Sequence, residues 1–167
     1  MALNFNGTNV PQSGAVNLNG TAAKAVQANG VVVWRKEIDL WNNGQYGSGG
    51  TPYVSYTVDG GAGQVNVVGS SLRIRGTQNV KIFFPNAIDT SGFSKINFSI
   101  DMLDHKGQTF LAGWGPALNN LTSTYDVRTQ GGNYTFSLPV SGTIYAGFHI
   151  VAPGQWPEVG FNRIWID

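Results

Sequence analysis

The sequence predicts an all-β protein: an antiparallel two-sheet sandwich, most consistent with a jelly roll, with an N-terminal β-hairpin appendage. Short runs alternate apolar and polar residues, which is the pattern of a half-buried strand. Glycine, at 23 of 167 residues, punctuates these runs as turns do. No segment carries an apolar stripe at helical spacing, so we expect little or no helix. A closed barrel is the alternative architecture.

The first 36 residues form a segment of their own. Three Asn-Gly pairs, beginning at Asn6, Asn19 and Asn29, separate short β-compatible runs, and Asn-Gly suits the type I′ turn of a hairpin. The clearest case joins residues 26–28 to residues 31–34. Isolated hairpins are marginal in water, so we expect this segment to dock on a partner. Its predicted contact residues are Phe5, Leu18, Val31, Val32, Val33 and Trp34.

The charged run 35–37 marks a boundary, and residues 37–167 form the predicted sandwich domain. Within it, residues 53–58 alternate, residues 59–63 read as a Gly-rich loop, and residues 72–84 hold further strand patterns. The cleanest strand is 95–102, where Ile96, Phe98, Ile100 and Met102 should face the core while Asn97 faces away. Similar patterns recur at residues 110–114, 134–140, 144–150 and 161–166.

Composition excludes several classes of partner. The net charge is +1 and the basic residues are scattered, so the electrostatic signature of a nucleic-acid or anionic-membrane binder is missing. No stretch approaches the roughly 18 apolar residues of a membrane span. The absence of cysteine excludes disulfides and thiolate sites. Because residues 1–6 carry no signal-peptide pattern, we expect synthesis in the cytoplasm of a host without export.

The sequence offers few candidates for catalytic residues, and we expect neither enzymatic activity nor a cofactor. His105 and His149 lie far apart in the sequence, and the pattern contains no nucleophile elbow, phosphate loop or metalloprotease motif. Carboxylates show no recognisable glycosidase pairing. Asp101 and Asp104 could hold Ca²⁺, but solvated turn carboxylates are the favoured interpretation, and no metal site is predicted.

The tryptophans favour ligand binding. Three of them sit beside Gly, Pro, Asn or Gln, where an indole in a loop could stack on a neutral sugar while amides bind its hydroxyl groups. The alternative for each of the three is a structural role, as a core residue or as a plug at the open end of the sandwich. Trp34 and Trp165, within apolar runs, are expected in the core. The candidate carbohydrate-binding residues are Trp41, Asn42, Asn43, Gln45, Tyr46, Trp114, Gln155 and Trp156.

Two stretches, 3–8 and 26–34, resemble the N-terminal hairpin segment of tailed-bacteriophage structural proteins, and 89–96 and 161–166 resemble strands of their β-sandwich modules. The resemblance implies a non-enzymatic protein located in the virion. It also implies homo-oligomers in the particle, other virion structural proteins as partners, and host cell-wall glycan as a ligand. Two alternatives stay open: a purely structural capsid or tail decoration or cement protein, and a free-standing carbohydrate-binding module.

Overall fold

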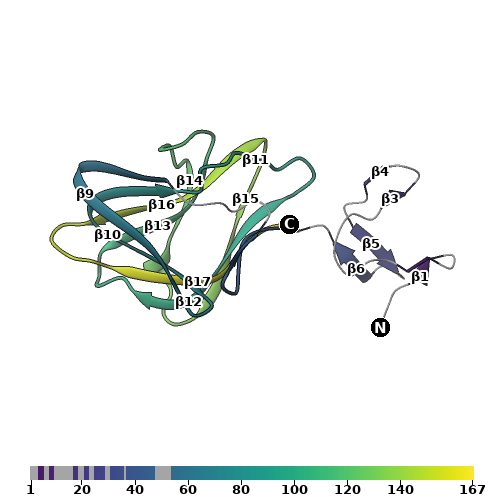
Figure 1. Cartoon of the computed structure of the whole chain (residues 1–167), viewed down its shortest axis with the longest axis horizontal. Coiled ribbons are helices and arrows are strands. Elements are labelled where there is room, and N and C mark those ends of the chain that lie inside the picture. The colour runs from purple at the N-terminus through teal and green to yellow at the C-terminus, as the bar shows by residue number, and fades with distance from the viewer. Residues whose placement is uncertain are drawn as a thin grey trace. The chain divides into compact units, whose positions relative to one another are not determined.

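The computed structural model describes residues 37–47 and 54–167, together with short strands within residues 4–35. Side chains are described for residues 37–47 and 61–167. The chain divides into two compact units, Met1–Glu37 with Asp167 and Ile38–Ile166. Within the described residues, the first unit holds strands β1 to β6 and the second holds β7 to β17 (Figure 1).

The N-terminal unit contains three separate antiparallel strand pairs, each flanking one of the Asn-Gly dipeptides. Strand β1 (Asn4–Phe5) pairs with β2 (Thr8–Asn9), and β3 (Asn17–Leu18) pairs with β4 (Thr21–Ala22). Strand β5 (Ala25–Ala28) pairs with β6 (Val31–Arg35), with Ala28 opposite Val31. The pairing confirms the predicted hairpins. The side chains of the predicted contact residues in this segment, from Phe5 to Trp34, lie outside the described ones.

The second unit is built from antiparallel strands, as predicted, with one short 3-10 turn, η1 (Val127–Thr129), as its helical element among the described residues. No helix in the described part has the length and apolarity needed to cross a membrane. The strands are β7 (Ile38–Asn42), β8 (Gln45–Tyr46), β9 (Val54–Val68), β10 (Ser71–Phe83), β11 (Ile88–Asp89), β12 (Lys95–Asp104), β13 (Thr109–Gly115), β14 (Ser123–Asp126), β15 (Tyr134–Pro139), β16 (Thr143–Ala152) and β17 (Glu158–Ile166).

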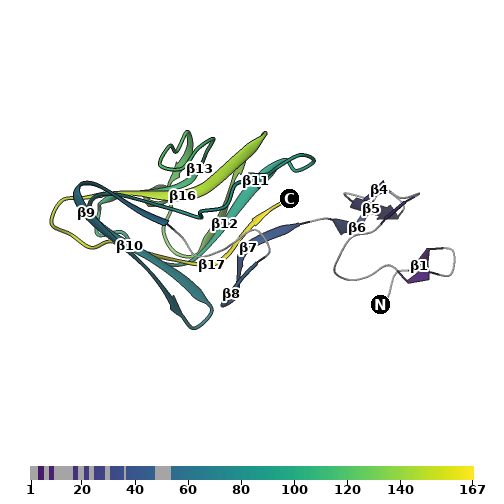
Figure 2. The same ribbon diagram turned by 45° about the horizontal axis from the view of Figure 1, so that its top comes forward.

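Strand β10 belongs to both layers of the sandwich. Its first half pairs with β17, which continues to β12 and β15, and its second half pairs with β16, which continues to β13 and β14. Strand β9 follows β10 along its other edge through both halves. Figures 1 and 2 show the two layers, one around β12 and β17 and the other around β13 and β16. The strand ladder is therefore continuous while the core lies between two layers.

Alternating side chains from both layers fill this core. Phe98, Phe148 and Phe161 meet at its centre, with ring centroids 5.2 to 6.3 Å apart in tilted and edge-on arrangements. Aromatic pairs prefer such geometries, and each ring removes a large apolar area from water. The three rings come from β12, β16 and β17, so this cluster joins the layers.

Strand β12 follows the predicted alternation only in its first half. Ile96, Phe98 and Ile100 are buried, as predicted. The ladder to β17 then shifts register between Ile100 and Met102. A bulge of this kind adds one residue and reverses the faces that follow it. Met102 is consequently half-buried on the outward side and Leu103 packs against the core, so the prediction for Met102 was wrong.

The Gly-rich stretch 59–63 is part of β9 and not the predicted loop. The β9–β10 hairpin bends here on its way between layers, with a register shift between Thr77 and Asn79. A Cβ atom on Gly63 would lie 2.9 Å from side-chain atoms of Val80 and Ile82. Glycine therefore serves close packing at the bend, which is the usual meaning of glycine inside a strand.

Candidate functional site

Strand β17 lies in the middle of its layer, between β12 on one side and β10 and β7 on the other. Its apolar residues Val159, Phe161, Ile164 and Ile166 point into the core and are fully buried. The residues between them point away from the core. We call this surface the β17 face: Glu158, Gly160, Arg163 and Trp165 with their outward cross-strand neighbours on β7, β10 and β12.

The loop before β17 holds Trp156 at one end of this face. Pro153 and Gly154 occupy the centre of a turn that the Gln155 amide closes onto the Ala152 oxygen at 3.3 Å, and Gly154 has φ of +68°. Proline followed by a left-handed glycine is the sequence of a type II turn. Pro157 is buried, and its oxygen accepts a hydrogen bond of 3.4 Å from the Gly76 amide. The loop is thus fixed on both sides of Trp156.

Trp156 keeps 40% of its surface exposed. The guanidinium carbon of Arg75 lies over its ring, 5.6 Å from the ring centroid. A guanidinium near an indole is attracted by the negative face of the ring, which helps to hold both side chains in place. The exposed indole is therefore oriented by its neighbour and still reachable from solvent.

Arg75 is positioned from the other side by Gln64. The two residues are cross-strand partners in the β9–β10 ladder. The Gln64 side-chain oxygen accepts from Nε of Arg75 at 2.7 Å and also accepts from Nη2. The amide therefore fixes the plane of the guanidinium group beside Trp156.

The middle of the β17 face is a polar network around Gly160. Arg73 forms an ion pair of 3.4 Å with Glu158 and donates from Nε to the Ser71 hydroxyl at 2.9 Å. Ser71 in turn donates to Asp101 at 2.8 Å. A Cβ atom on Gly160 would lie 2.5 Å from both the Asp101 carboxylate and the Ser71 hydroxyl. Glycine at this position leaves room for the network.

At the far end, Arg163 lies over the Trp165 ring, with its guanidinium carbon 4.6 Å from the centroid. Asp39 accepts from Arg163 at 2.8 Å and from the Asn42 side chain at 3.1 Å. Trp165 is half-buried on the outward face, so its expected place in the core was wrong. Side chains alternate between the two faces of a strand, and Trp165 lies between Ile164 and Ile166, which both point into the core. The predicted residue Asn42 therefore orients an Asp–Arg pair.

The predicted site around Trp41 does not form an open platform. Trp41 lies on β7, a strand that the sequence pattern did not predict, and is fully buried opposite Ile164. Tyr46, 38% exposed, meets the Trp41 ring edge-on at 5.1 Å. Asn43 occupies the β7–β8 turn with φ of +44°, and Gln45 is exposed. The prediction that Trp41 is a ligand platform needs correction, because its ring is buried in the core and cannot contact a ligand.

Trp114 is also tied into the sandwich. It is half-buried against the core, and its indole N–H donates to the Pro139 oxygen at 2.9 Å. Trp156 is thus the predicted loop tryptophan whose ring has substantial exposure, and Gln155 beside it is exposed. The structure does not bring the three predicted tryptophans together on one surface.

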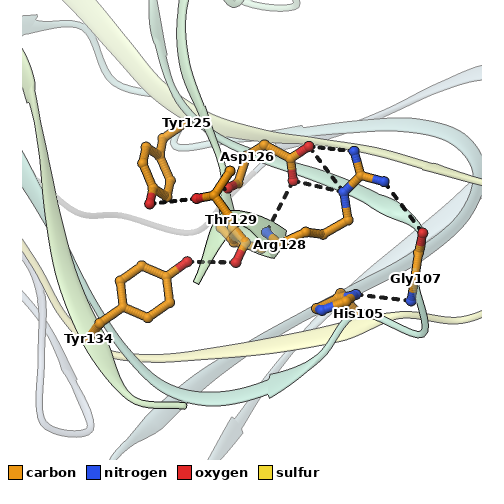
Figure 3. A network of polar contacts seen from close by, with 8 residues as sticks. His105, Gly107, Tyr125, Asp126, Arg128, Thr129 and Tyr134 are labelled. Atoms are coloured by element: carbon orange, nitrogen blue, oxygen red, sulfur yellow. Dashed lines mark hydrogen bonds and ion pairs between the residues drawn. The ribbon is translucent and has the colours of Figure 1, made fainter. Parts of the chain in front are cut away.

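A second polar cluster closes the edge of the sandwich near η1 (Figure 3). Arg128 donates to both Asp126 carboxylate oxygens, and this hydrogen bonding holds the pKa of Asp126 below its usual value. The Tyr134 hydroxyl donates to the Val127 oxygen at 2.6 Å, and burial raises the pKa of Tyr134. The ring of Tyr125 stacks on Phe136 at 4.3 Å. These contacts join β14 to β15 and give the cluster a structural role.

The remaining candidate groups are dispersed. His149 contacts the Asn79 side chain at 2.6 Å, whereas the Nδ1 atom of His105 accepts from the Gly107 amide in a turn. Asp101 accepts from Ser71, while Asp104 pairs with Lys106 at 3.5 Å. Among the residues that the structure describes, no three His, Asp or Glu side chains gather as metal ligands would.

No protein-family model and no curated protein matches the sequence. A solved structure of a family 11 carbohydrate-binding module from Clostridium thermocellum, in complex with a β-1,3-1,4-mixed-linked tetrasaccharide, is similar. Its TM-score is 0.53 at 14% identity, and the match covers 78% of this chain and 94% of that chain. A low-affinity xylan-binding module from Roseburia intestinalis has a TM-score of 0.47 at 12% identity, covering 70% of this chain and 96% of that chain.

The chain is a β-sandwich of the jelly-roll type. At such identities the likeness establishes the fold, and one fold hosts many functions. The sequence pattern indicated Trp156 and Gln155 but not Arg75 and Gln64, which form the other half of the same surface. The available signal was the alternation of Arg73 and Arg75 with Leu72 and Ile74, which places both arginines outward without indicating what they meet.

Proposed function

We propose that the sandwich unit binds carbohydrate without catalysing a reaction, and that Trp156 supplies the stacking surface. The observation that carries this proposal is the exposed indole of Trp156, held in a fixed loop beside an oriented arginine and an amide. An apolar indole surrounded by polar groups matches a sugar, which presents C–H groups on the face of its ring and hydroxyl groups around the edge. The solved module of the same fold carries an oligosaccharide, which supports this class of ligand.

The expected affinity of one such surface is weak. A single open platform buries little area, so the dissociation constant should lie near the millimolar end, where the binding free energy is about −4 kcal/mol. Useful adhesion then requires several copies on one particle or several contacts along one polymer.

The test is titration of the intact protein with soluble polysaccharides, with the fold of every variant checked by circular dichroism. Trp156→Ala should weaken binding about tenfold, which corresponds to about 1.4 kcal/mol. Trp156→Phe keeps an aromatic surface and should weaken it less. Val67→Ala is the control and should bind as the parent does, since Val67 is an apolar residue on β9 that is 51% exposed and is no candidate for the site. If Trp156→Ala binds every polysaccharide as the parent does, the proposal is wrong.

A second candidate function is attachment to a virion through the N-terminal unit. It is supported by the three isolated strand pairs β1–β2, β3–β4 and β5–β6, because two-stranded pieces of this length need a partner for stability. In this function the sandwich is displayed on the particle, with glycan binding or with decoration alone. Retention of the sandwich on virions by residues 1–36 is the property to measure.

A further inference from the structure

The arginines of the sandwich differ in their partners. Four have described side chains, and three of these are paired with a carboxylate: Arg73 with Glu158, Arg128 with Asp126 and Arg163 with Asp39. The contacts of Arg75 are the neutral Gln64 amide and the Trp156 ring. Within the described residues, Arg75 is therefore the arginine that forms no ion pair with a carboxylate.

The strand register makes this difference specific. Glu158 lies directly opposite Arg75 in the β10–β17 ladder. Its carboxylate nevertheless contacts Arg73, the arginine two residues earlier on β10. Asp104, opposite Glu158 on β12, pairs with Lys106. Both carboxylates are thus engaged elsewhere, and among the side chains that the structure describes, no carboxylate forms an ion pair with Arg75 beside Trp156.

The hydrogen bonds of Arg75 leave a particular edge open. A guanidinium group has five N–H donors in one plane. Gln64 accepts from Nε and Nη2, which lie along one side of that plane. The end formed by Nη1 and Nη2 still carries N–H groups that make no contact in the described part of the chain. That end has the geometry that binds a carboxylate through two parallel hydrogen bonds.

Trp156 defines what else the ligand must contain. The guanidinium carbon lies 5.6 Å from the indole centroid, so a ring that contacts the exposed indole brings its substituents within reach of Arg75. A sugar that carries a carboxylate on its ring satisfies both groups together. Neutral hydroxyl groups would also bind Arg75, but they would leave its charge unpaired.

We propose that the Trp156–Arg75 surface selects an acidic sugar, a hexuronic acid residue whose ring contacts Trp156 and whose carboxylate binds Arg75. This proposal rests on the carbohydrate-binding function proposed above and names its substrate class. It also replaces the neutral saccharide expected from the sequence, where Arg75 and Trp156 are too far apart to suggest a pair.

The test compares polymers that differ only in charge: polygalacturonate and alginate, each against its carboxyl-reduced neutral form. The intact protein should bind at least one acidic polymer about tenfold more tightly than its reduced form, a difference of about 1.4 kcal/mol. Added salt should weaken binding of the acidic polymer and leave the reduced form unaffected, because screening acts on charges. A sulfated galactan should bind less tightly than the preferred polyuronate.

Three variants assign the preference to Arg75. Arg75→Gln should bind the acidic and reduced polymers equally, while Arg75→Lys should retain part of the preference because it keeps the charge and loses the bidentate geometry. Arg128→Gln removes the same charge from an arginine in η1, on a different part of the sandwich, and should retain the full preference.

Each result decides between the two proposals. Equal binding of acidic and reduced polymers, with both lost in Trp156→Ala, overturns acidic-sugar selection and leaves carbohydrate binding standing. Equal loss of preference in Arg75→Gln and Arg128→Gln shows a general charge effect and also overturns it. Sulfated galactan binding as tightly as polyuronate overturns the assignment to a carboxylate. Absence of binding to every polymer, acidic or neutral, overturns both proposals.

Discussion

The indole N–H of Trp114 on β13 donates a hydrogen bond of 2.9 Å to the backbone oxygen of Pro139 on β15. The two strands belong to different layers of the sandwich, so this contact ties the layers together at one end. The sequence suggested Trp114 as a ligand platform. It is instead a structural link, because its indole N–H is hydrogen-bonded within the sandwich.

Trp114→Phe should lower the free energy of unfolding by about 1 kcal/mol, the usual contribution of one hydrogen bond. Trp114→Ala should lower it by about 3 kcal/mol, because the apolar part of the indole packs against the core as well. Urea denaturation of both variants measures these differences. Equal stability of Trp114→Ala and the parent would show that the link contributes nothing.

Two neighbouring residues on β12 give a second prediction. Phe98 is fully buried and stacks on Phe136 at 5.0 Å, so Phe98→Ala should cost about 3 to 5 kcal/mol. Asn97 faces the other way, as the alternation in the sequence predicts. It is only 2% exposed, however, and accepts a hydrogen bond of 2.7 Å from Ser137.

Asn97→Ala should therefore cost about 1 to 1.5 kcal/mol, because the hydrogen bonds of its side chain with Ser137 and with the Trp165 oxygen are lost. Ser99→Ala, at the next outward position of β12, is the matched control and should change stability by less than about 0.5 kcal/mol. Chemical denaturation of the three variants ranks them. An Asn97→Ala protein as stable as Ser99→Ala would remove the proposed role of the hydrogen bond.

The β9–β10 bend gives a third prediction. A Cβ atom on Gly76 would lie 2.4 Å from the Val80 side chain and 3.1 Å from both the Ala62 oxygen and the Ile150 side chain. Gly76→Ala should destabilise the sandwich by about 1 to 3 kcal/mol through overpacking. Gly131→Ala is the control, since nothing lies within 4 Å of its Cβ position. Thermal unfolding should separate the two alanine variants clearly, and similar midpoints would contradict the packing at the bend.

His149 predicts a pH dependence of stability. Burial, and secondarily the charge of Lys81, hold its pKa below the ordinary value of 6.5. The unfolded chain therefore binds a proton more readily than the folded one, so stability rises with pH across this window. The contribution is fully present above pH 6.5 and is lost as the pH falls through the lower pKa of the folded state. Melting temperatures of the parent should fall more steeply with acidification than those of His149→Gln, and parallel curves would contradict this.

The sequence predicted the strands and turns that are determined by the residues within them. Alternation located β12, β13, β15 and β16, and the Asn-Gly dipeptides located the three strand pairs of the N-terminal unit. It failed where a distant strand decides the outcome. The bulge before Met102 depends on the ladder to β17. The glycine-rich part of β9 lies where the strand bends, because its partner β10 crosses between layers. The pairing of Arg75 with Trp156 depends on a strand register that no local pattern contains.

The final prediction concerns the N-terminal unit. In the described backbone, β1 to β6 pair only among themselves in three two-stranded sheets, while β7 begins the ladder of the sandwich at Ile38. A chain lacking residues 1–36 should therefore keep the melting temperature of the sandwich within about 3 °C, the shift that 1 kcal/mol produces in a domain of this size. It should also bind polysaccharide as the full chain does, because Trp156 and Arg75 belong to the second unit. On the attachment function, the shortened chain should fail to join virions that retain the full chain. Global unfolding of the shortened chain would show that the first unit belongs to the core. Normal incorporation into virions would show that attachment depends on the sandwich instead.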